Sequence, residues 1–207
     1  MNSVIPKQFL LLGGKPVLMH TINAFQQFNS GIEIILVLPQ TEIGAWRDLC
    51  NLYRFSAKHT IGEGGDKRFF SVKNAIPFIT EKSVVAIHDG VRPFLNSKII
   101  YHGYETAERL GNAIPSIVVD SSIRVIEDGS SKAVDRNLYR IIQTPQFFDS
   151  EILKRCYEQE YSENFTDDAS VIETFGEKIN LIDGDPKNIK ITTQQDLLIA
   201  EVLFKQP

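Results

Sequence analysis

The sequence has few of the features that mark secreted, disulfide-rich or membrane proteins. It contains only two cysteines, Cys50 and Cys156, which are far apart and lack C-x-x-C spacing. We expect both to be reduced and at least partly buried thiols. Apolar runs such as IILVLP fall far short of the roughly 20 residues of a membrane span, and the N-terminus lacks the basic-then-apolar layout of a secretion signal. These absences favour a cytoplasmic protein without a membrane partner.

Excess positive charge and the signatures of several enzyme classes are also absent. The formal net charge is -4, which argues against a basic nucleic-acid-binding domain, although a small anionic ligand needs only local cations. No Ser-His-Asp set, His/Cys metal cluster or complete G-x-G-x-x-G fingerprint can be assembled. Without a repeat, low-complexity tract or linker, and with 43% hydrophobic residues, residues 1–207 are expected to form a single domain.

Apolar periodicity then predicts helices that alternate with strands. Residues at helical spacing predict helices over 16–28, 43–53, 67–79, 97–110, 149–161, 167–175 and 194–204, the last with Thr193 as its N-cap. Apolar, largely β-branched runs predict strands at 32–39, 57–61, 83–88, 113–119, 178–183 and 188–192. This alternation indicates a Rossmann-like, doubly wound α/β fold with a mostly parallel sheet and helices on both faces.

The segment 120–142 interrupts the alternation. Two short stretches of strand pattern flank Asp128-Gly129, a dipeptide typical of tight hairpin turns. A β-hairpin alone is marginally stable in water. We therefore expect this arm to pack against a second copy of the chain, which makes the protein a homodimer.

Polar clusters follow several predicted strands, at the edge where α/β proteins bind ligands. They are GEGGDKR (62–68), HDGVRPF (88–94), Asp120-Ser121, Thr144-Pro145-Gln146 and Lys190. Asp66 and Ser71 can offer an acceptor and a hydroxyl to a base edge, while Asp89 and Arg92 can present a carboxylate and a guanidinium to one crevice.

Each cluster also has a simpler structural interpretation. The glycine-rich loop can be a flexible turn, and Asp89 with Arg92 an internal ion pair. Arg136 and Lys190 can be solvated charges, Thr144 and Thr166 capping hydroxyls, and His88 a structural hydrogen-bonding group. The residues alone therefore predict only an α/β crevice whose cations and hydroxyls suit phosphates.

Six segments together carry a more specific resemblance. They are PKQFLLLGGKPVLMHT (6–21), GGDKRFFSV (64–72), HDGVRPF (88–94), VDRNLYRIIQTPQFF (134–148), TDDAS (166–170) and NIKITTQQDL (188–197). In this order, over nearly the whole chain, they resemble the 2-C-methyl-D-erythritol 4-phosphate cytidylyltransferases of the non-mevalonate isoprenoid pathway. The resemblance implies that CTP and the sugar phosphate are joined, with release of pyrophosphate, by in-line attack of a substrate phosphate oxygen on the α-phosphate. Two anions must meet, so catalysis is charge neutralisation and alignment.

The resemblance also implies residue roles. Lys7 stabilises charge at the α-phosphate, and Arg136 and Lys190 position the nucleophile. The CTP-binding set is Lys7, Gly65, Asp66, Ser71, Asp89 and Gly90. The set for the polyol phosphate is Asp89, Arg92, Ser121, Arg136, Thr144, Thr166 and Lys190, with Ser121 where the family commonly has threonine. Ser121 and Arg136 lie on the arm, which in relatives reaches the neighbour's site. Mg²⁺ or another divalent cation would be held mainly by the CTP phosphates, with Asp89 the nearest candidate protein ligand.

One departure from the family pattern is at the front. Relatives begin with an apolar strand and a glycine-rich loop that ends in Arg-Met and cradles the triphosphate; Met1 falls at that methionine. We therefore expect the neighbours of that strand to keep open edges, and the 207-residue chain to release little pyrophosphate.

Three alternatives to an active methylerythritol enzyme stay open. The first concerns the missing front: the sequence is either a shortened form of an active enzyme or a non-catalytic binding or regulatory homologue. Ribitol-5-phosphate cytidylyltransferase shares the lysine, HD-x-x-RPF and NIKIT motifs, although VDRNLYRIIQTPQFF favours the methylerythritol family. A dehydrogenase is the least favoured, because no dinucleotide fingerprint is present.

Overall fold

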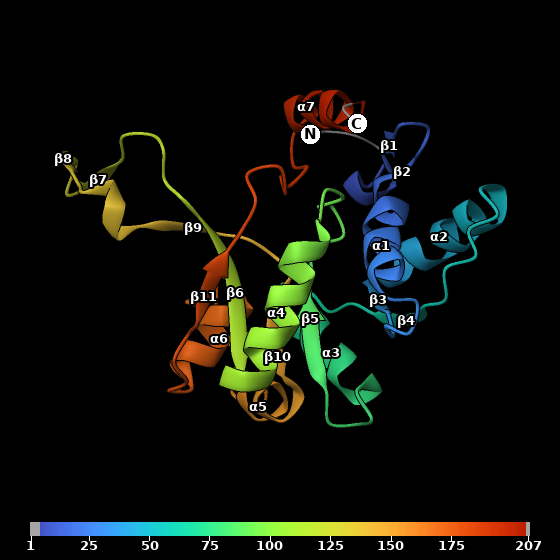
Figure 1. Cartoon of the computed structure of the whole chain (residues 1–207), viewed down its shortest axis with the longest axis horizontal. Helices are drawn as coiled ribbons and strands as arrows, with labels where there is room; N and C mark the ends of the chain where they lie inside the picture. Colours follow the sequence, from blue (N-terminus) through green and yellow to red (C-terminus); the bar gives the residue numbers. More distant parts are fainter. Residues whose placement is uncertain (1–4, 206–207) are drawn as a thin grey trace.

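A computed structural model describes residues 5–205 as a mixed α/β fold (Figure 1). The helices are α1 Val17–Phe28, α2 Gln40–Leu52, α3 Arg68–Ala75, α4 Ser97–Leu110, α5 Ser150–Cys156, α6 Asp168–Thr174 and α7 Gln194–Phe204. The strands are β1 Leu11–Leu12, β2 Lys15–Pro16, β3 Ile35–Leu38, β4 Thr60–Glu63, β5 Val84–Ile87, β6 Asn112–Val118, β7 Arg124–Glu127, β8 Ser130–Ala133, β9 Arg140–Ile142, β10 Gln146–Asp149 and β11 Leu181–Asp183. Short 3-10 helices are η1 Lys7–Phe9, η2 Ile76–Phe78 and η3 Arg136–Leu138. The comparison of Met1 with the family's methionine lies outside the described residues.

The main sheet has the strand order β11-β6-β10-β5, and β9 pairs with the far half of β6. Only β11 runs parallel to its neighbour β6; β10 is antiparallel to both β6 and β5, and β9 is antiparallel to β6. The prediction of a mostly parallel sheet is therefore wrong here. The reason is the hairpin arm, which reverses the chain after β6 so that β9 and β10 return against it.

Helices cover both faces of this sheet, as predicted. Phe147 and Phe148 are neighbours on β10 and point to opposite faces. Phe147 packs with residues of α4, and Phe148 packs with residues of α3, α5 and α6. Both rings are fully buried, so one strand supplies the centre of two apolar layers.

A second, two-stranded sheet pairs β3 with β4 in parallel. Within residues 5–205, β3 pairs only with β4, and β5 pairs only with β10. The free edges of β3 and β5 face a cavity of about 790 Å³, lined along its length by Ile32–Pro39 and Ser83–Val91. The open edges expected from the sequence are present.

Helix boundaries follow local capping chemistry. The predicted bounds of α4 and α7 are confirmed. The side chain of Asn96 accepts the Ile99 N–H at the start of α4, and Gly111 ends it with φ +86°. Thr193 caps α7, as predicted, in a reciprocal capping box with Asp196. In both helices the cap residue itself fixed the boundary.

The predicted strand at 188–192 is wrong. Its backbone groups bond to loops and side chains instead of a strand ladder. Nη1 of Arg92 donates a hydrogen bond to the carbonyl oxygen of Asn188, and the Ile191 N–H donates to the Val91 carbonyl. The segment is therefore an extended loop at the end of β5.

The hairpin is confirmed. β7 and β8 pair antiparallel, and Asp128 and Gly129 take φ values of 47° and 74° at the turn. The arm projects from the end of β6, away from the body of the chain (Figure 1). Both cysteines are free, with Cys156 buried and Cys50 half-buried, as predicted. In the part of the chain described, no helix is long and apolar enough to cross a membrane.

The close packing of α4 on β10 can be tested at Gly103. A Cβ atom there would lie 2.1 Å from Cε2 of Phe147, whereas one at Gly44 in α2 would meet nothing within 4 Å. We expect Gly103→Ala to lower the free energy of unfolding by about 1–3 kcal/mol through overpacking. Gly44→Ala should raise it by roughly 0.5–1 kcal/mol, because alanine is the better helix former. Urea unfolding measures both; equal effects of the two changes would contradict the packing described.

Candidate functional site

Asp89 lies two residues after the end of β5 and is shared by two cations. Nε of Arg92 donates to Oδ2 of Asp89 over 3.0 Å, and Nζ of Lys190 lies 3.2 Å from the same oxygen. The Asp89 and Arg92 side chains are only 12% and 11% exposed, whereas that of Lys190 is 45% exposed. The site therefore combines a fixed ion pair with a lysine that faces solvent.

The charge balance of this cluster keeps Asp89 ionised. Burial raises the pKa of the carboxyl, but Lys190 and Arg92 together outweigh burial, and the pKa is lowered. Two cations beside one carboxylate leave a net positive charge. Such a cluster can receive a further anion.

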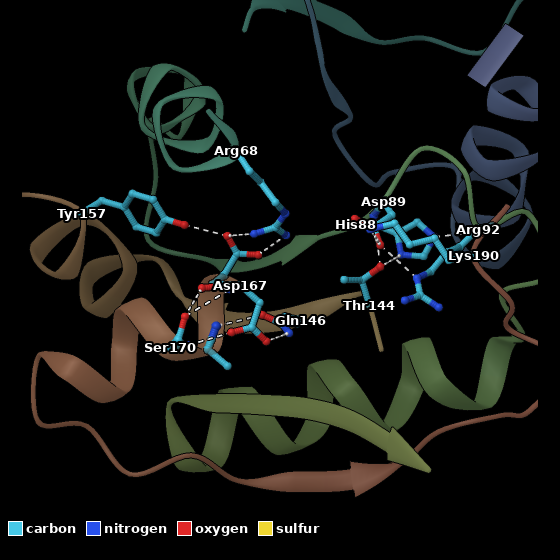
Figure 2. Close-up of polar contacts among 12 residues, drawn as sticks. Arg68, His88, Asp89, Arg92, Thr144, Gln146, Tyr157, Asp167, Ser170 and Lys190 are labelled. Atoms are coloured by element: carbon cyan, nitrogen blue, oxygen red, sulfur yellow. Dashed lines mark hydrogen bonds and ion pairs between the residues drawn. The ribbon is translucent and has the colours of Figure 1, made fainter. Parts of the chain in front are cut away.

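Backbone and side-chain hydrogen bonds hold the cluster in place (Figure 2). The Asp89 N–H donates to Oγ1 of Thr144 over 3.1 Å, and that hydroxyl donates to Nδ1 of His88 over 3.0 Å. Nε2 of His88 donates to the Arg92 carbonyl over 3.1 Å. Asn188, which is fully buried, donates to the Thr144 carbonyl over 2.8 Å. Thr144 is thus a buried scaffold for Asp89.

His88 has the structural role that the sequence left open. Burial lowers the pKa of its imidazole to about 4. The ring is therefore neutral near pH 7, which fits an acceptor at Nδ1 and a donor at Nε2.

The loop that precedes α3 brings backbone and hydroxyl groups together. The Gly65 N–H donates to Oγ of Ser71 over 3.1 Å, and that hydroxyl reaches the Lys67 carbonyl at 3.2 Å. A Cβ atom at Gly65 would lie 2.4 Å from Cβ of Phe70, so the turn requires glycine. Asp66 is exposed at its tip. The turn can present an edge of polar groups to a flat ligand.

One end of the large cavity joins these two places. Ser71 and Arg68 from the α3 side, and Asp89 and Gly90 from the β5 side, all line it. Gln8 lines the same cavity, and the neighbouring Lys7 is exposed on η1. The structure thus gathers Gly65, Ser71, Asp89, Gly90, Arg92, Thr144 and Lys190 around one crevice and places Lys7 next to a lining residue.

Three predicted residues lie apart from this group. Ser121 donates to Oδ1 of Asp120 over 3.0 Å, and Arg136 donates to the Asp120 carbonyl. Within residues 5–205 of this single chain, no hydrogen bond or ion pair joins these two residues to Asp89, Arg92 or Lys190. Thr166 is exposed beside a small pocket that Arg68 also lines.

The sequence analysis missed a second polar cluster beside the crevice. Arg68 pairs with both carboxylate oxygens of Asp168, and the Tyr157 hydroxyl donates to Oδ1 of Asp168 over 2.6 Å. Asp168 is completely buried. The only signal in the sequence was the position of Arg68 and Asp168 in two family segments, and nothing in either segment shows that they pair.

The crevice offers one carboxylate to a metal ion, so most ligands of such an ion would have to come from a bound substrate. Among the described residues, no group of three or more His, Cys, Asp or Glu side chains forms a metal site. Asp89 is a single carboxylate at the crevice. This donor set fits a divalent cation that takes most of its oxygens from a polyphosphate.

Comparisons with known proteins identify the family that this chain resembles in sequence and fold. The profile described as "IspD: 2-C-methyl-D-erythritol 4-phosphate cytidylyltransferase" matches residues 1–206. The chain is 48% identical to the protein of that name from Phocaeicola vulgatus and 47% identical to that from Bacteroides fragilis, each over 99% of this chain and 93% of the relative.

A solved structure of the Thermus thermophilus protein of the same name has a TM-score of 0.78 at 28% identity, covering 97% of this chain and 95% of the other. The Anaerococcus prevotii 4-diphosphocytidyl-2C-methyl-D-erythritolsynthase gives 0.83 at 26% identity, over 95% and 88%.

The buried imidazole of His88 makes stability depend on pH. The pKa of His88 is about 4 in the folded chain, compared with an ordinary value of 6.5, so the unfolded chain binds a proton first as the pH falls. The contribution of the neutral His88 ring to the free energy of unfolding is complete above about pH 6.5. It is lost as the pH falls from 6.5 to 4. Lowering the pH from 7 to 5 should reduce the free energy of unfolding by roughly 1–2 kcal/mol at this residue. Urea unfolding at both values measures the slope.

A matched pair of variants assigns the slope. His88→Gln should flatten it, whereas His102→Gln, at an exposed position on α4, should retain it. An unchanged slope in His88→Gln would show that other groups are responsible.

Proposed function

The chain belongs to the 2-C-methyl-D-erythritol 4-phosphate cytidylyltransferase family, and from this premise we propose how the crevice at the end of β5 carries out the family's reaction. The enzyme joins CTP and 2-C-methyl-D-erythritol 4-phosphate into the CDP-linked alcohol, with release of pyrophosphate, in the non-mevalonate isoprenoid pathway. In a Rossmann-like fold, ligands bind at this edge of the sheet.

The proposal for the polyol phosphate is carried by the cluster of Asp89, Arg92 and Lys190. Arg92 is held between Asp89 and the Asn188 carbonyl, so its charge is fixed before substrate arrives. Lys190 is half-exposed and can turn from Asp89 to a phosphate oxygen. Thr144 supports this pocket through the bonds of its buried hydroxyl to Asp89 and His88. Thr166 is proposed to add a hydroxyl from the neighbouring small pocket that Arg68 also lines. The pocket thereby offsets the repulsion between the attacking phosphate and the triphosphate.

The cytosine end of CTP is proposed to bind at the loop before α3. The backbone of Gly65, the carboxylate of Asp66 and the hydroxyl of Ser71 supply donors and acceptors for the base edge. Asp89 and Gly90 then lie near the ribose, and Lys7 reaches the phosphates. With the base at one end and the polyol phosphate at the other, the α-phosphate lies in line with its nucleophile.

A divalent cation, Mg²⁺ in the simplest case, is proposed to enter with CTP. It would neutralise phosphate charge and orient the leaving pyrophosphate. Asp89 is the carboxylate best placed to take one coordination position, because its ion pairs with Arg92 and Lys190 both use Oδ2.

We also propose that the hairpin arm, residues 120–142, joins two copies of the chain. Large apolar side chains are exposed along it and at its base: Val118, Ile126, Leu138, Tyr139, Ile141 and Ile142. A second copy would cover this surface. It would also bring Ser121 and Arg136 to the phosphate pocket of the partner, where they could position the nucleophile.

The remaining proposals concern organisation and location. Residues 1–207 act as one catalytic domain, with the arm as its extension. The enzyme works in the cytoplasm, a reducing compartment that suits the two free thiols.

The activity is tested by measuring pyrophosphate release from CTP in the presence of Mg²⁺ with either polyol phosphate. The assay uses a chain extended at its front by the family's apolar strand and glycine-rich loop, because residues 1–207 alone are expected to release little pyrophosphate. We expect turnover of 2-C-methyl-D-erythritol 4-phosphate at least tenfold more efficient, in kcat/KM, than that of ribitol 5-phosphate. Lys190→Ala should lower kcat/KM for the polyol phosphate at least a hundredfold, since a charge-assisted phosphate contact is lost. A preference for ribitol 5-phosphate would reject the substrate assignment.

The dimer is tested by light scattering after size-exclusion chromatography. We expect twice the mass of the chain, and the mass of one chain after Ile126→Asp combined with Leu138→Asp. Leu198→Asp, at an equally exposed position on α7, is the control and should leave the dimer intact. A monomeric unchanged protein would contradict the role proposed for the arm.

A further inference from the structure

We propose that Arg68 binds the α-phosphate of CTP, and that Asp168 and Tyr157 are the residues that position its guanidinium. This inference rests on the proposed function and adds to it a phosphate ligand and its support.

Two buried side chains, Asp168 and Tyr157, fix the guanidinium of Arg68. Nη1 of Arg68 donates to Oδ1 of Asp168 over 2.6 Å, and Nη2 pairs with Oδ2. Tyr157, which is 1% exposed, donates its hydroxyl to Oδ1 over 2.6 Å. In Figure 2 the Arg68 side chain points from α3 toward this carboxylate, with Tyr157 on the opposite side. The fork of the arginine therefore has one orientation.

The support for Asp168 is itself rigid. The preceding Asp167 caps α6 through a reciprocal pair of hydrogen bonds with Ser170. Gln146 of β10 donates to Oδ2 of Asp167 over 2.7 Å and accepts the Ala169 N–H over 2.9 Å. Through these contacts the start of α6 is fastened to the main sheet. The carboxylate that holds Arg68 is therefore attached to the main sheet rather than to a flexible loop.

Part of the guanidinium remains free to meet a ligand. An arginine has five N–H donors, and the two bonds to Asp168 leave three. The Arg68 side chain is 38% exposed and lines the large cavity with Ser71, Asp89 and Gly90. The arrangement suits an anion that approaches from the crevice.

The position of Arg68 identifies which anion this is. Arg68 lies between the base-binding loop, which it directly follows, and Asp89. Burial raises the pKa of the Asp89 carboxyl, and the charges of Lys190 and Arg92 outweigh it. The charge of Arg68 adds a smaller effect that also lowers this pKa, which indicates that Arg68 is close to Asp89. Two groups of CTP lie between the base and the incoming polyol phosphate, the ribose and the α-phosphate. Only the α-phosphate is an anion, so it is the group that a guanidinium would bind there. Fixing the guanidinium in advance reduces the entropy lost when that phosphate binds.

The test compares CTP with cytidine, which has the base and ribose but no phosphate. Dissociation constants for both are measured by calorimetry for the unchanged protein, Arg68→Lys, Asp168→Asn and Tyr157→Phe. We expect Arg68→Lys and Asp168→Asn to weaken CTP binding at least tenfold and cytidine binding less than twofold. Tyr157→Phe, which removes only the supporting hydroxyl, should weaken CTP binding by about threefold.

A matched control is Lys67→Ala, which removes the neighbouring cation in its exposed pair with Glu163 and should leave both constants within twofold. Equal losses for CTP and cytidine, or no loss for either, would overturn the proposal. Asp168→Asn removes a buried charge and can lower stability. If Asp168→Asn does not fold, the result for Arg68→Lys, at a partly exposed position, decides the test.

Failure of the proposed function has a different signature. In that case the chain extended by the family's strand and glycine-rich loop binds CTP but forms no product with 2-C-methyl-D-erythritol 4-phosphate, and the comparison of CTP with cytidine still decides the role of Arg68. If the unchanged protein binds CTP no more tightly than cytidine, the phosphate contact itself is rejected.

Discussion

The carboxylate of Asp89, almost buried between Arg92 and Lys190, is the interaction on which the site depends. A buried carboxylate is costly unless cations and donors surround it, and here they come from distant parts of the chain. Arg92 is three residues away, Lys190 lies in the loop before α7, and Thr144 precedes β10. Satisfying this one charge fixes the relative positions of the three segments that form the crevice.

The charge distribution explains how an acidic chain can bind anions. The formal net charge is -4, yet Arg92 and Lys190 share the carboxylate of Asp89 at the end of β5, and Arg68, which pairs with Asp168, lines the same cavity as Asp89. The low exposure of Asp89 and Arg92 strengthens their interaction relative to the screened charges elsewhere on the surface. The charge of the ligand is therefore indicated by the local charge of the crevice and not by the net charge of the whole chain.

How far the sequence could predict the fold and the site depended on the range of the contacts involved. The bounds of α4 and α7 and the hairpin turn at Asp128-Gly129 depend on residues within a few positions, and these predictions were confirmed. The same holds for placing Asp89 at a strand end. The antiparallel pairing of β10 and the loop at 188–192 depend on distant partners. No strand was predicted at 146–149, and the predictions of a mostly parallel sheet and of a strand at 188–192 were wrong. The pairing of Arg68 with Asp168, one hundred positions apart, left no local pattern at all.

The two phenylalanines of β10 have a consequence for the way the protein unfolds. Phe147 lies at the centre of the apolar layer under α4, and Phe148 at the centre of the layer under α5 and α6. Neither layer can lose its packing without disturbing the backbone that the other shares, so the two melt as one cooperative unit. Gln146, the residue that fastens α6 to the sheet, immediately precedes them. The order of the site is therefore coupled to the global stability of the fold rather than to a local fluctuation.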